Sequence, residues 1–178
     1  MKIGLVRHFK VNVKPGEGGL TSSEFEKAMK NYDSADVTPN ELKVTDADWD
    51  ICYASSLPRA VKTAQIIYGG GVITSDLLRE VPILPFTKRN FVLPAFFWHT
   101  AARIAWVKNR PSQPEGKLQT QERIKKFLEM INASNYKNIL IVSHGFFMGS
   151  LFRELIRRGF KGEMDVRPRN GKLYILEK

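Results

Sequence analysis

Residues 139–145, Ile-Leu-Ile-Val-Ser-His-Gly, form a short apolar run that ends in a polar turn. A run of this length, followed by a predicted helix over 146–157, is typical of a buried strand that leads into a helix. An apolar run followed by polar residues also occurs at the beginning of the chain, where Ile3-Gly-Leu-Val6 is followed by Arg7 and His8. It recurs where Trp49-Asp-Ile-Cys-Tyr-Ala54 precedes a helical pattern from Leu57 to Tyr68 that ends at three glycines.

The remaining elements complete an alternation of strands and helices. Thr21 or Ser22 is a suitable cap for a helix that carries Phe25, Ala28, Met29 and Tyr32 on one side. Further elements are predicted as a strand over Val72–Thr74, a helix over Leu118–Ile131 and a final, edge-type strand over Lys172–Glu177. Strands separated by helices predict an α/β fold, a three-layer α/β/α sandwich with a mostly parallel central sheet.

One segment breaks the alternation. Residues 82–116 contain five prolines and an aromatic-rich, helix-like stretch at about Ala95–Lys108. We interpret it as a short insertion or lid on a single domain that spans residues 1–178. Its aromatic residues and histidine either form an apolar wall for a ligand or, more simply, anchor the insertion on the core; they are Phe91, Phe96, Phe97, Trp98, His99 and Trp106.

Composition limits the class of protein. The chain has 178 residues, of which 43% are hydrophobic and 26% charged, as in an ordinary folded domain rather than a disordered or fibrous one. No apolar run is long enough to cross a membrane, and residues 1–8 reach charge too early for a signal peptide. Cys52 is the single cysteine and is expected to be a core residue, so a reducing cytoplasm is the expected location.

The net charge of +10 is distributed unevenly. Residues 1–89 carry 12 basic and 11 acidic side chains, whereas residues 90–178 carry 16 and 7, so the second half holds +9 of the total. An excess of this kind favours an anionic partner, which it can also steer, but an ordinary solvated surface explains it equally well. Arg153, Arg157 and Arg158 share a helix face, for which solvent exposure is the simplest interpretation.

Polar and basic residues follow three of the predicted strands. These are Arg7-His8, then Ser55-Ser56 with Arg59, and Ser143-His144-Gly145. Ligands of open α/β sheets bind at the carboxyl ends of the strands, so these residues are expected to meet there. Arginine forks suit phosphate oxygens, and helices that begin after residues 57 and 145 are placed to aim backbone N–H groups at an anion. Each piece alone also has an ordinary structural explanation, so it is their combination that predicts a phosphate site.

The chain resembles the histidine phosphatase superfamily, with its phosphoglycerate-mutase-like fold. The motifs that carry the resemblance are Gly4-Leu-Val-Arg-His-Phe9, Ser55-Ser-Leu-Pro-Arg-Ala-Val-Lys-Thr-Ala64, Leu78-Arg-Glu80 and Ile139-Leu-Ile-Val-Ser-His-Gly145, in family order. The resemblance implies that His8 is the nucleophile and that Arg7, Arg59 and His144 hold the phosphoryl oxygens. It implies that Glu80 is the general acid and base, and that no metal or cofactor is needed.

Departures from the family pattern bear on the substrate. Phe9 replaces a glycine and is expected to reshape the entrance of the pocket, while Lys14 replaces an asparagine and is an additional candidate for phosphate binding. The insertion is short, Gly116-Lys-Leu118 lacks a carboxylate and a hydroxyl of the family, and Val81-Pro-Ile83 lacks the mutase pattern. A phosphomonoesterase acting on a small phosphorylated molecule or a phosphoprotein is therefore favoured. The alternatives are a phosphoglycerate-mutase-type phosphotransferase, a catalytically weak phosphate-binding module, and nucleic-acid binding through the basic half.

Overall fold

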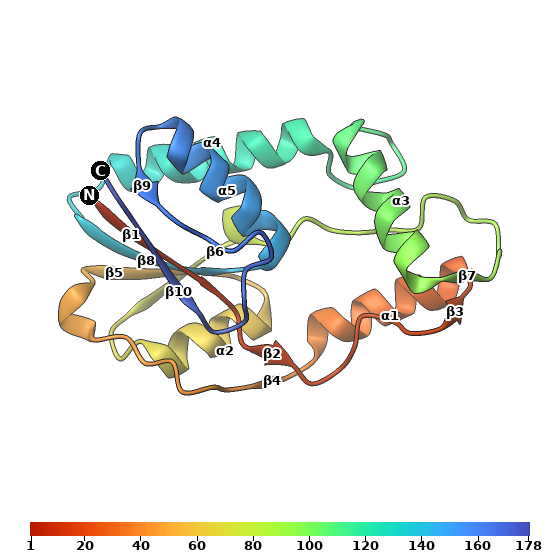
Figure 1. Cartoon of the computed structure of the whole chain (residues 1–178), viewed down its shortest axis with the longest axis horizontal. Coiled ribbons are helices and arrows are strands. Elements are labelled where there is room, and N and C mark those ends of the chain that lie inside the picture. The colour runs from red at the N-terminus through yellow and green to blue at the C-terminus, as the bar shows by residue number, and fades with distance from the viewer.

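The computed structural model describes residues 1–178, apart from the side chain of Asp46. A central six-stranded sheet has the strand order β6-β5-β8-β1-β10-β9 (Figure 1). Its strands are β1 (Lys2–Arg7), β5 (Ile51–Ser55), β6 (Val72–Ser75), β8 (Asn138–Ser143), β9 (Lys161–Gly162) and β10 (Leu173–Glu177). The helices are α1 (Ser22–Ser34), α2 (Pro58–Ile67), α3 (Ala95–Val107), α4 (Lys117–Asn132) and α5 (Gly145–Arg157).

The sheet is mostly parallel, as the strand and helix alternation predicts. β1, β5, β6 and β8 run in one direction, and β10 pairs antiparallel with β1. β10 is not at the edge of the sheet as expected, because the two-residue strand β9 pairs with Leu176 and Glu177. So short a strand leaves no periodicity in the sequence, and the beginning of β10 still has a neighbour on one side only.

Two apolar clusters form the layers above and below the sheet. One face of the sheet is covered by α4 and α5, and the other by α2 (Figure 1). The first face carries Ile3, Leu5, Ile139 and Ile141. The second, whose cluster is called the α2-side cluster, carries Val6, Leu140 and Val142. The side chains of one strand alternate between the two faces, so β1 and β8 are buried on both sides. This burial explains why their sequences are continuously apolar.

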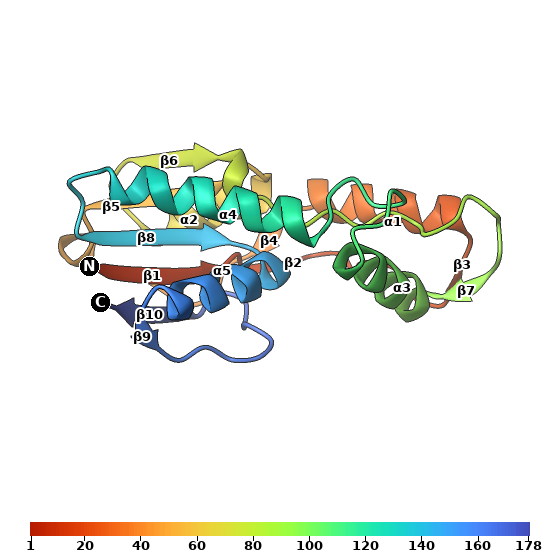
Figure 2. The same cartoon turned by 90° about the horizontal axis from the view of Figure 1, so that it is seen from above.

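The remaining elements extend the molecule beyond the carboxyl ends of the parallel strands. α1 and α3 lie there together with the small strands β3 (Gly19–Leu20) and β7 (Leu93–Pro94), which pair with each other (Figure 2). Thr21 caps α1 and forms a capping box with Glu24. Two further short strands, β2 (Lys10–Val11) and β4 (Val37–Thr38), pair below the main sheet. No helix in the described part of the chain is long and apolar enough to cross a membrane.

We expect Gly4→Ala to destabilise the fold. A Cβ atom at this position of β1 would stand 2.4 Å from Cη2 of Trp49, which packs over the glycine in the α2-side cluster. Such overpacking typically costs about 1–3 kcal/mol of unfolding free energy. Urea unfolding measures it, and Gly149→Ala in α5 is the matched control. No atom lies within 4 Å of a Cβ at Gly149, so this helix should gain about 0.5–1 kcal/mol. Equal stability of the two variants would contradict the packing argument.

Candidate active site

His8 lies just after β1, where the strand leaves the sheet. Its side chain is buried, with 2% of the residue exposed, and its backbone N–H donates to Ser143 O at 2.9 Å. Nδ1 lies 2.7 Å from Phe9 O. A carbonyl oxygen only accepts hydrogen bonds, so Nδ1 carries the proton in the neutral ring. Nε2 of the neutral His8 ring is therefore left with a lone pair, which is what a nucleophile requires.

The protonation state of His8 is controlled by its surroundings. Burial and the charge of Arg59 are the main causes that lower its pKa to about 3; Arg7 adds to this effect, and the hydrogen bond to Phe9 opposes it. The imidazole is consequently neutral at physiological pH. Burial, together with the same arginines that suit an anion, thus keeps this ring unprotonated.

His144 lies beside His8 at the end of β8, with the two ring centroids 5.1 Å apart. It is completely buried, and burial, with Arg59 next in importance, holds its pKa well below the ordinary value of 6.5. Nε2 of His144 is 2.7 Å from Ser55 Oγ, which also accepts a hydrogen bond from Leu57 N. With Ser55 donating its hydroxyl proton to Nε2, His144 keeps a proton on Nδ1.

Arg7 and Arg59 bring two guanidinium groups to the two histidines. Arg7 donates from Nη1 to Pro168 O at 2.8 Å, and the almost fully buried Arg59 pairs through Nη1 with Asp33 Oδ1 at 2.9 Å. Gly145 allows Arg7 to lie close to the backbone, because a Cβ there would be 3.1 Å from Nε of Arg7.

Three buried side-chain nitrogens have no hydrogen-bond partner among the described residues. They are Nε of Arg7, Nε of Arg59 and Nδ1 of His144. Unpaired buried donors are costly and rare in folded proteins. Their gathering around His8 is what a site needs if it offers several hydrogen bonds and two positive charges to one anion.

Glu80 reaches the same region from the loop after the 3₁₀ turn Asp76–Leu78. Its carboxylate accepts hydrogen bonds from Phe147 N and Val81 N, both at 2.9 Å, and from Phe146 N at 3.2 Å. It therefore occupies N–H groups at the beginning of α5 that the sequence suggested were available to a bound anion. Helix N-termini attract negative charge, which here orients the carboxylate.

Arg123 of α4 holds the loop that carries Glu80. It donates from Nη1 to Leu77 O and Arg79 O, each at 2.9 Å, and pairs with the half-buried Glu115. Ser143 adds a hydrogen bond from Oγ to Leu78 O at 2.7 Å. The position of Glu80 is thus fixed by contacts to α4, β8 and α5.

Although His144 is completely buried and does not line it, a cavity of about 530 Å³ joins the other groups of the site. It is lined by Arg7, His8, Arg59 and Glu80 together with residues of α1, α3 and the loop 81–84. Among the described residues, no group of three or more His, Cys, Asp or Glu side chains is placed to hold a metal ion.

Two residues that were expected near a ligand, Lys14 and Phe9, do not line the cavity. Lys14 does not line the cavity: its side chain is 74% exposed, and its ammonium group pairs with Glu17 in the loop. Phe9, expected to reshape the entrance, is completely buried in the α2-side cluster and does not line the cavity either. Successive side chains of an extended backbone point in opposite directions, so the residue after His8 faces the core.

The aromatic residues of the insertion do not form a wall of the cavity. Trp98 and Trp106 are buried, as the anchoring interpretation predicts, whereas Phe91, Phe96 and Phe97 are exposed. Of the six residues only His99 lines the cavity, and its ring packs edge-on against Phe25. Cys52 is a core residue, and burial raises the pKa of its thiol to about 12.

Two residues that line the cavity or support His8 belong to none of the sequence motifs. Arg103 of α3 lines the cavity, donates to Val81 O at 3.3 Å, and lies 3.6 Å above the centre of the Phe146 ring. Its signal in the sequence is that it is the only charged residue of an otherwise uncharged helix. Asn170 donates from Nδ2 to His8 O at 2.7 Å and so fixes the backbone of His8. It is 162 residues away in the chain, and no local pattern marks it.

The lowered pKa values of His8 and His144 predict that the protein loses stability in mild acid. Their folded-state pKa values are lowered, so the unfolded chain binds more protons below about pH 6.5, and stability falls as the pH falls from about 6.5 toward 3. Each contributes a slope of about 1.4 kcal/mol per pH unit. Urea unfolding of the wild type and of His8→Asn between pH 5 and 6.5 measures it. The variant should show the smaller slope, and identical slopes would mean that His8 is not buried as a neutral ring.

Known proteins match the chain in sequence and in fold. The family model described as "Histidine phosphatase superfamily (branch 1)" matches residues 40–178. A curated protein of Hydrogenobacter thermophilus, named "Putative phosphoserine phosphatase 2", is 32% identical over 105 residues. The match covers 54% of this chain and 50% of that protein, so the chain spans about half the length of the curated relative.

Solved structures share the whole architecture. The α-ribazole phosphatase of Shigella flexneri is 21% identical, with a TM-score of 0.62 over 98% of this chain and 89% of that one. A phosphoserine phosphatase of Entamoeba histolytica, solved as a mutant with phosphoserine, is 18% identical, with a TM-score of 0.57 and the same coverage. At these identities the similarity establishes the fold, a three-layer α/β/α sandwich of the phosphoglycerate-mutase type.

Proposed function

Because the chain belongs to the histidine phosphatase superfamily, we propose that it is a phosphomonoesterase that works through a phosphohistidine on His8. One observation carries the proposal: the three unpaired buried nitrogens of Arg7, Arg59 and His144 surround a neutral imidazole. The nitrogens supply hydrogen bonds and charge for a phosphoryl group, and the imidazole supplies the nucleophile.

In the first step Nε2 of His8 attacks phosphorus while the bond from phosphorus to the ester oxygen breaks. The leaving oxygen takes a proton from the carboxyl group of Glu80, so that an alcohol departs. Arg7, Arg59 and His144 bind the three equatorial oxygens, on which negative charge is spread in the transition state. The pairing of Nδ1 with Phe9 O fixes the tautomer of the ring and the direction of the Nε2 lone pair before substrate arrives.

In the second step water attacks the phosphohistidine. Glu80, now a carboxylate, removes a proton from the water, and the bond between Nε2 and phosphorus breaks. Inorganic phosphate leaves and His8 returns to its neutral form. Charge stabilisation comes throughout from the guanidinium groups, and the proposed reaction requires no metal ion or cofactor.

A small phosphorylated molecule is the proposed substrate class. The cavity of about 530 Å³ is in the range of small-ligand sites, and its walls away from His8 are mixed, with Met29 and Ile83 beside Arg79 and Arg103. The similar proteins bear the names "Putative phosphoserine phosphatase 2" and "Alpha-ribazole Phosphatase", both of which refer to small phosphate monoesters. The placement of the Phe9 side chain in the core weakens the case for a binding module without turnover.

Trapping the intermediate tests the mechanism. The protein is mixed with a ³²P-labelled aryl phosphate in the presence of a metal chelator and quenched in alkali within milliseconds. We expect label on the protein that survives alkali, is lost in acid and maps to the peptide carrying His8. Release of phosphate distinguishes a phosphatase from a mutase, which would instead transfer the label to a second hydroxyl group. Turnover without any labelled protein would contradict the covalent route.

A further inference from the structure

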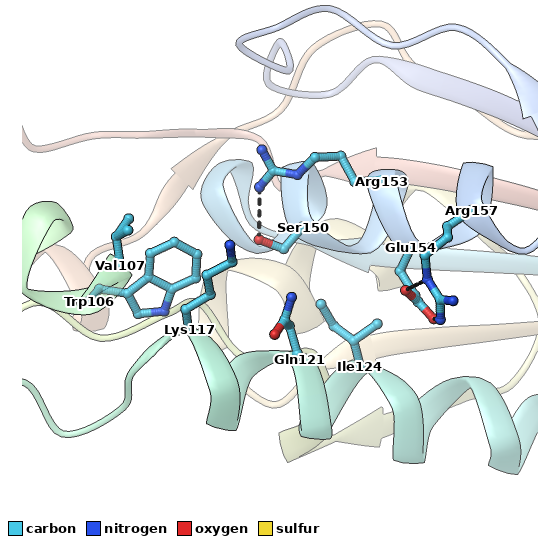
Figure 3. Close-up of a pocket in the computed structure, with 9 residues that line it drawn as sticks. All are labelled: Trp106, Val107, Lys117, Gln121, Ile124, Ser150, Arg153, Glu154 and Arg157. Atoms are coloured by element: carbon cyan, nitrogen blue, oxygen red, sulfur yellow. Dashed lines mark hydrogen bonds and ion pairs between the residues drawn. The ribbon is translucent and has the colours of Figure 1, made fainter. Parts of the chain in front are cut away.

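A second cavity lies between α4 and α5 on the face of the sheet opposite α2. Its volume is about 420 Å³, and it shares no lining residue with the cavity around His8. Figure 3 shows α4 along one side, α5 along the other and the end of α3 closing it. The lining residues are Trp106, Val107, Lys117, Gln121, Ile124, Ser150, Arg153, Glu154 and Arg157.

Helical spacing explains why these side chains meet. Lys117, Gln121 and Ile124 follow each other at four and three residues on α4, and Ser150, Arg153 and Arg157 at three and four on α5. Residues at these spacings lie on one face of a helix. The two faces oppose each other across the cavity, as the sticks in Figure 3 show.

The charges of this cavity are unbalanced. Glu154 is its only acidic residue, and it is already paired with Arg157 at 2.6 Å and with Arg158 at 2.8 Å. Those two arginines lower the pKa of Glu154 to about 2, so it stays a carboxylate. Lys117 and Arg153 have no carboxylate within ion-pair distance in the described part of the chain, and the Arg153 guanidinium donates a hydrogen bond to Ser150 Oγ at 3.3 Å.

The floor of the cavity is apolar. Trp106 and Ile124 are buried side chains that present carbon to it, and Val107 is at the rim. The indole N–H of Trp106 is already used, because it donates to Thr120 Oγ1 at 2.9 Å. The Trp106 ring therefore has only its carbon surface to offer, while Gln121 and Ser150 add neutral polar groups beside the two cations.

We propose that this cavity is a second binding site, which takes a small organic anion with a flat apolar part. The carboxylate, phosphate or sulfonate group of the ligand lies between Lys117 and Arg153, and its ring lies on Trp106 and Ile124. A purely inorganic anion would leave the apolar floor unused, and a neutral ring would leave the two cations unused. The site assigns a use to part of the basic excess in residues 90–178, and it does not depend on the reaction proposed for His8.

A chain of contacts connects this site to the cavity around His8, here called the catalytic cavity. The ring of Trp106 packs edge-on against Phe146, with centroids 4.8 Å apart, and the backbone N–H of Phe146 donates to Glu80. Arg103, which lines the catalytic cavity, stacks on the same Phe146 ring. Trp106, on which the ligand would lie, is thus two contacts away from the carboxylate of Glu80.

Binding of 1-naphthalenesulfonate to the full chain tests the proposal. Calorimetry gives the affinity. The NMR resonance of the Trp106 indole N–H, assigned by comparison with Trp106→Phe, shows whether the ligand binds beside Trp106. We expect saturable binding that shifts this resonance and is weakened roughly 10- to 100-fold in Lys117→Ala/Arg153→Ala. The matched control, Lys126→Ala/Arg167→Ala, removes two exposed cations that line neither cavity and should bind as the wild type does.

Three results of the experiments with 1-naphthalenesulfonate would each overturn the proposal. The first is a linear, unsaturated titration, and the second is saturable binding that leaves the Trp106 resonance in place. The third is equal affinity in the two double variants. Inorganic sulfate and neutral 1-naphthalenemethanol complete the series, and either of them binding as tightly as the sulfonate would contradict an amphipathic anion site. Arg59→Met, which removes a cation from the catalytic cavity alone, should leave the calorimetric affinity unchanged.

Discussion

His8→Ala is expected to lower kcat/KM for an aryl phosphate by about 10⁴-fold or more. The variant removes Nε2, the only atom that forms the covalent bond to phosphorus in the proposed reaction. The arginines and His144 remain, so phosphate or vanadate should still bind, and the ³²P label should no longer appear on the protein. Steady-state kinetics and the alkaline quench measure the two effects on one preparation.

His99→Ala is the control for His8→Ala, since His99 is a histidine that lines the same cavity. Its ring contacts Phe25 and its Nε2 lies 3.1 Å from Pro15 O, so it has a supporting place in the fold. We expect less than about a tenfold loss of kcat/KM, because no bond to phosphorus depends on it. Comparable losses in the two variants, or full activity of His8→Ala, would refute the assignment of His8 as the nucleophile.

Arg59→Met is expected to reduce kcat/KM by about 10²–10³-fold and to change the pH profile. The side chain is almost fully buried, and the unpaired Nε of Arg59 is one of the three donors offered to the phosphoryl group. Its charge is also the largest electrostatic cause of the lowered pKa of His8. Removing a positive charge favours the imidazolium form, so the pKa of His8 rises and the acid limb of kcat/KM moves to higher pH.

Asp33→Asn tests whether the expected effects of Arg59→Met come from the loss of the Arg59 cation or from the loss of its ion pair with Asp33. Asp33 is the partner of Arg59 at 2.9 Å, but its own side chain is 55% exposed, so the variant keeps the buried cation and loses a screened contact. We expect less than about a tenfold change in kcat/KM and an unmoved acid limb. Urea unfolding of both variants checks that the fold persists. An acid limb that stays in place in Arg59→Met would show that this arginine does not control the protonation of His8.

Local patterns in the sequence account for most of the elements. Apolar runs that are buried on both faces mark β1, β5 and β8, and the capping box of Thr21 and Glu24 marks the beginning of α1. The exceptions are the two-residue strands, which pair through backbone atoms and are too short to leave a side-chain signal; they are β2, β3, β4, β7 and β9.

The candidate site was only partly predictable. His8, Arg59 and His144 stand at strand ends in the sequence and meet in the structure, since the carboxyl ends of parallel strands share one edge. Lys14 has the same charge but sits in a loop that turns to solvent. Phe9 is next to His8 and faces the opposite way, into the core.

By itself, the sequence determined the fold class, the family and the clustering of His8 and His144 with two arginines, because strand periodicity and motif spacing are local properties. Only the tertiary structure decided which nitrogens are left without partners, where Glu80 finds its backbone donors, and that Arg103 and Asn170 join the site. It also placed Lys117 and Arg153, parts of the basic half, across one cavity. Burial, hydrogen-bond satisfaction and charge balance depend on contacts between residues far apart in the chain, which no local pattern records.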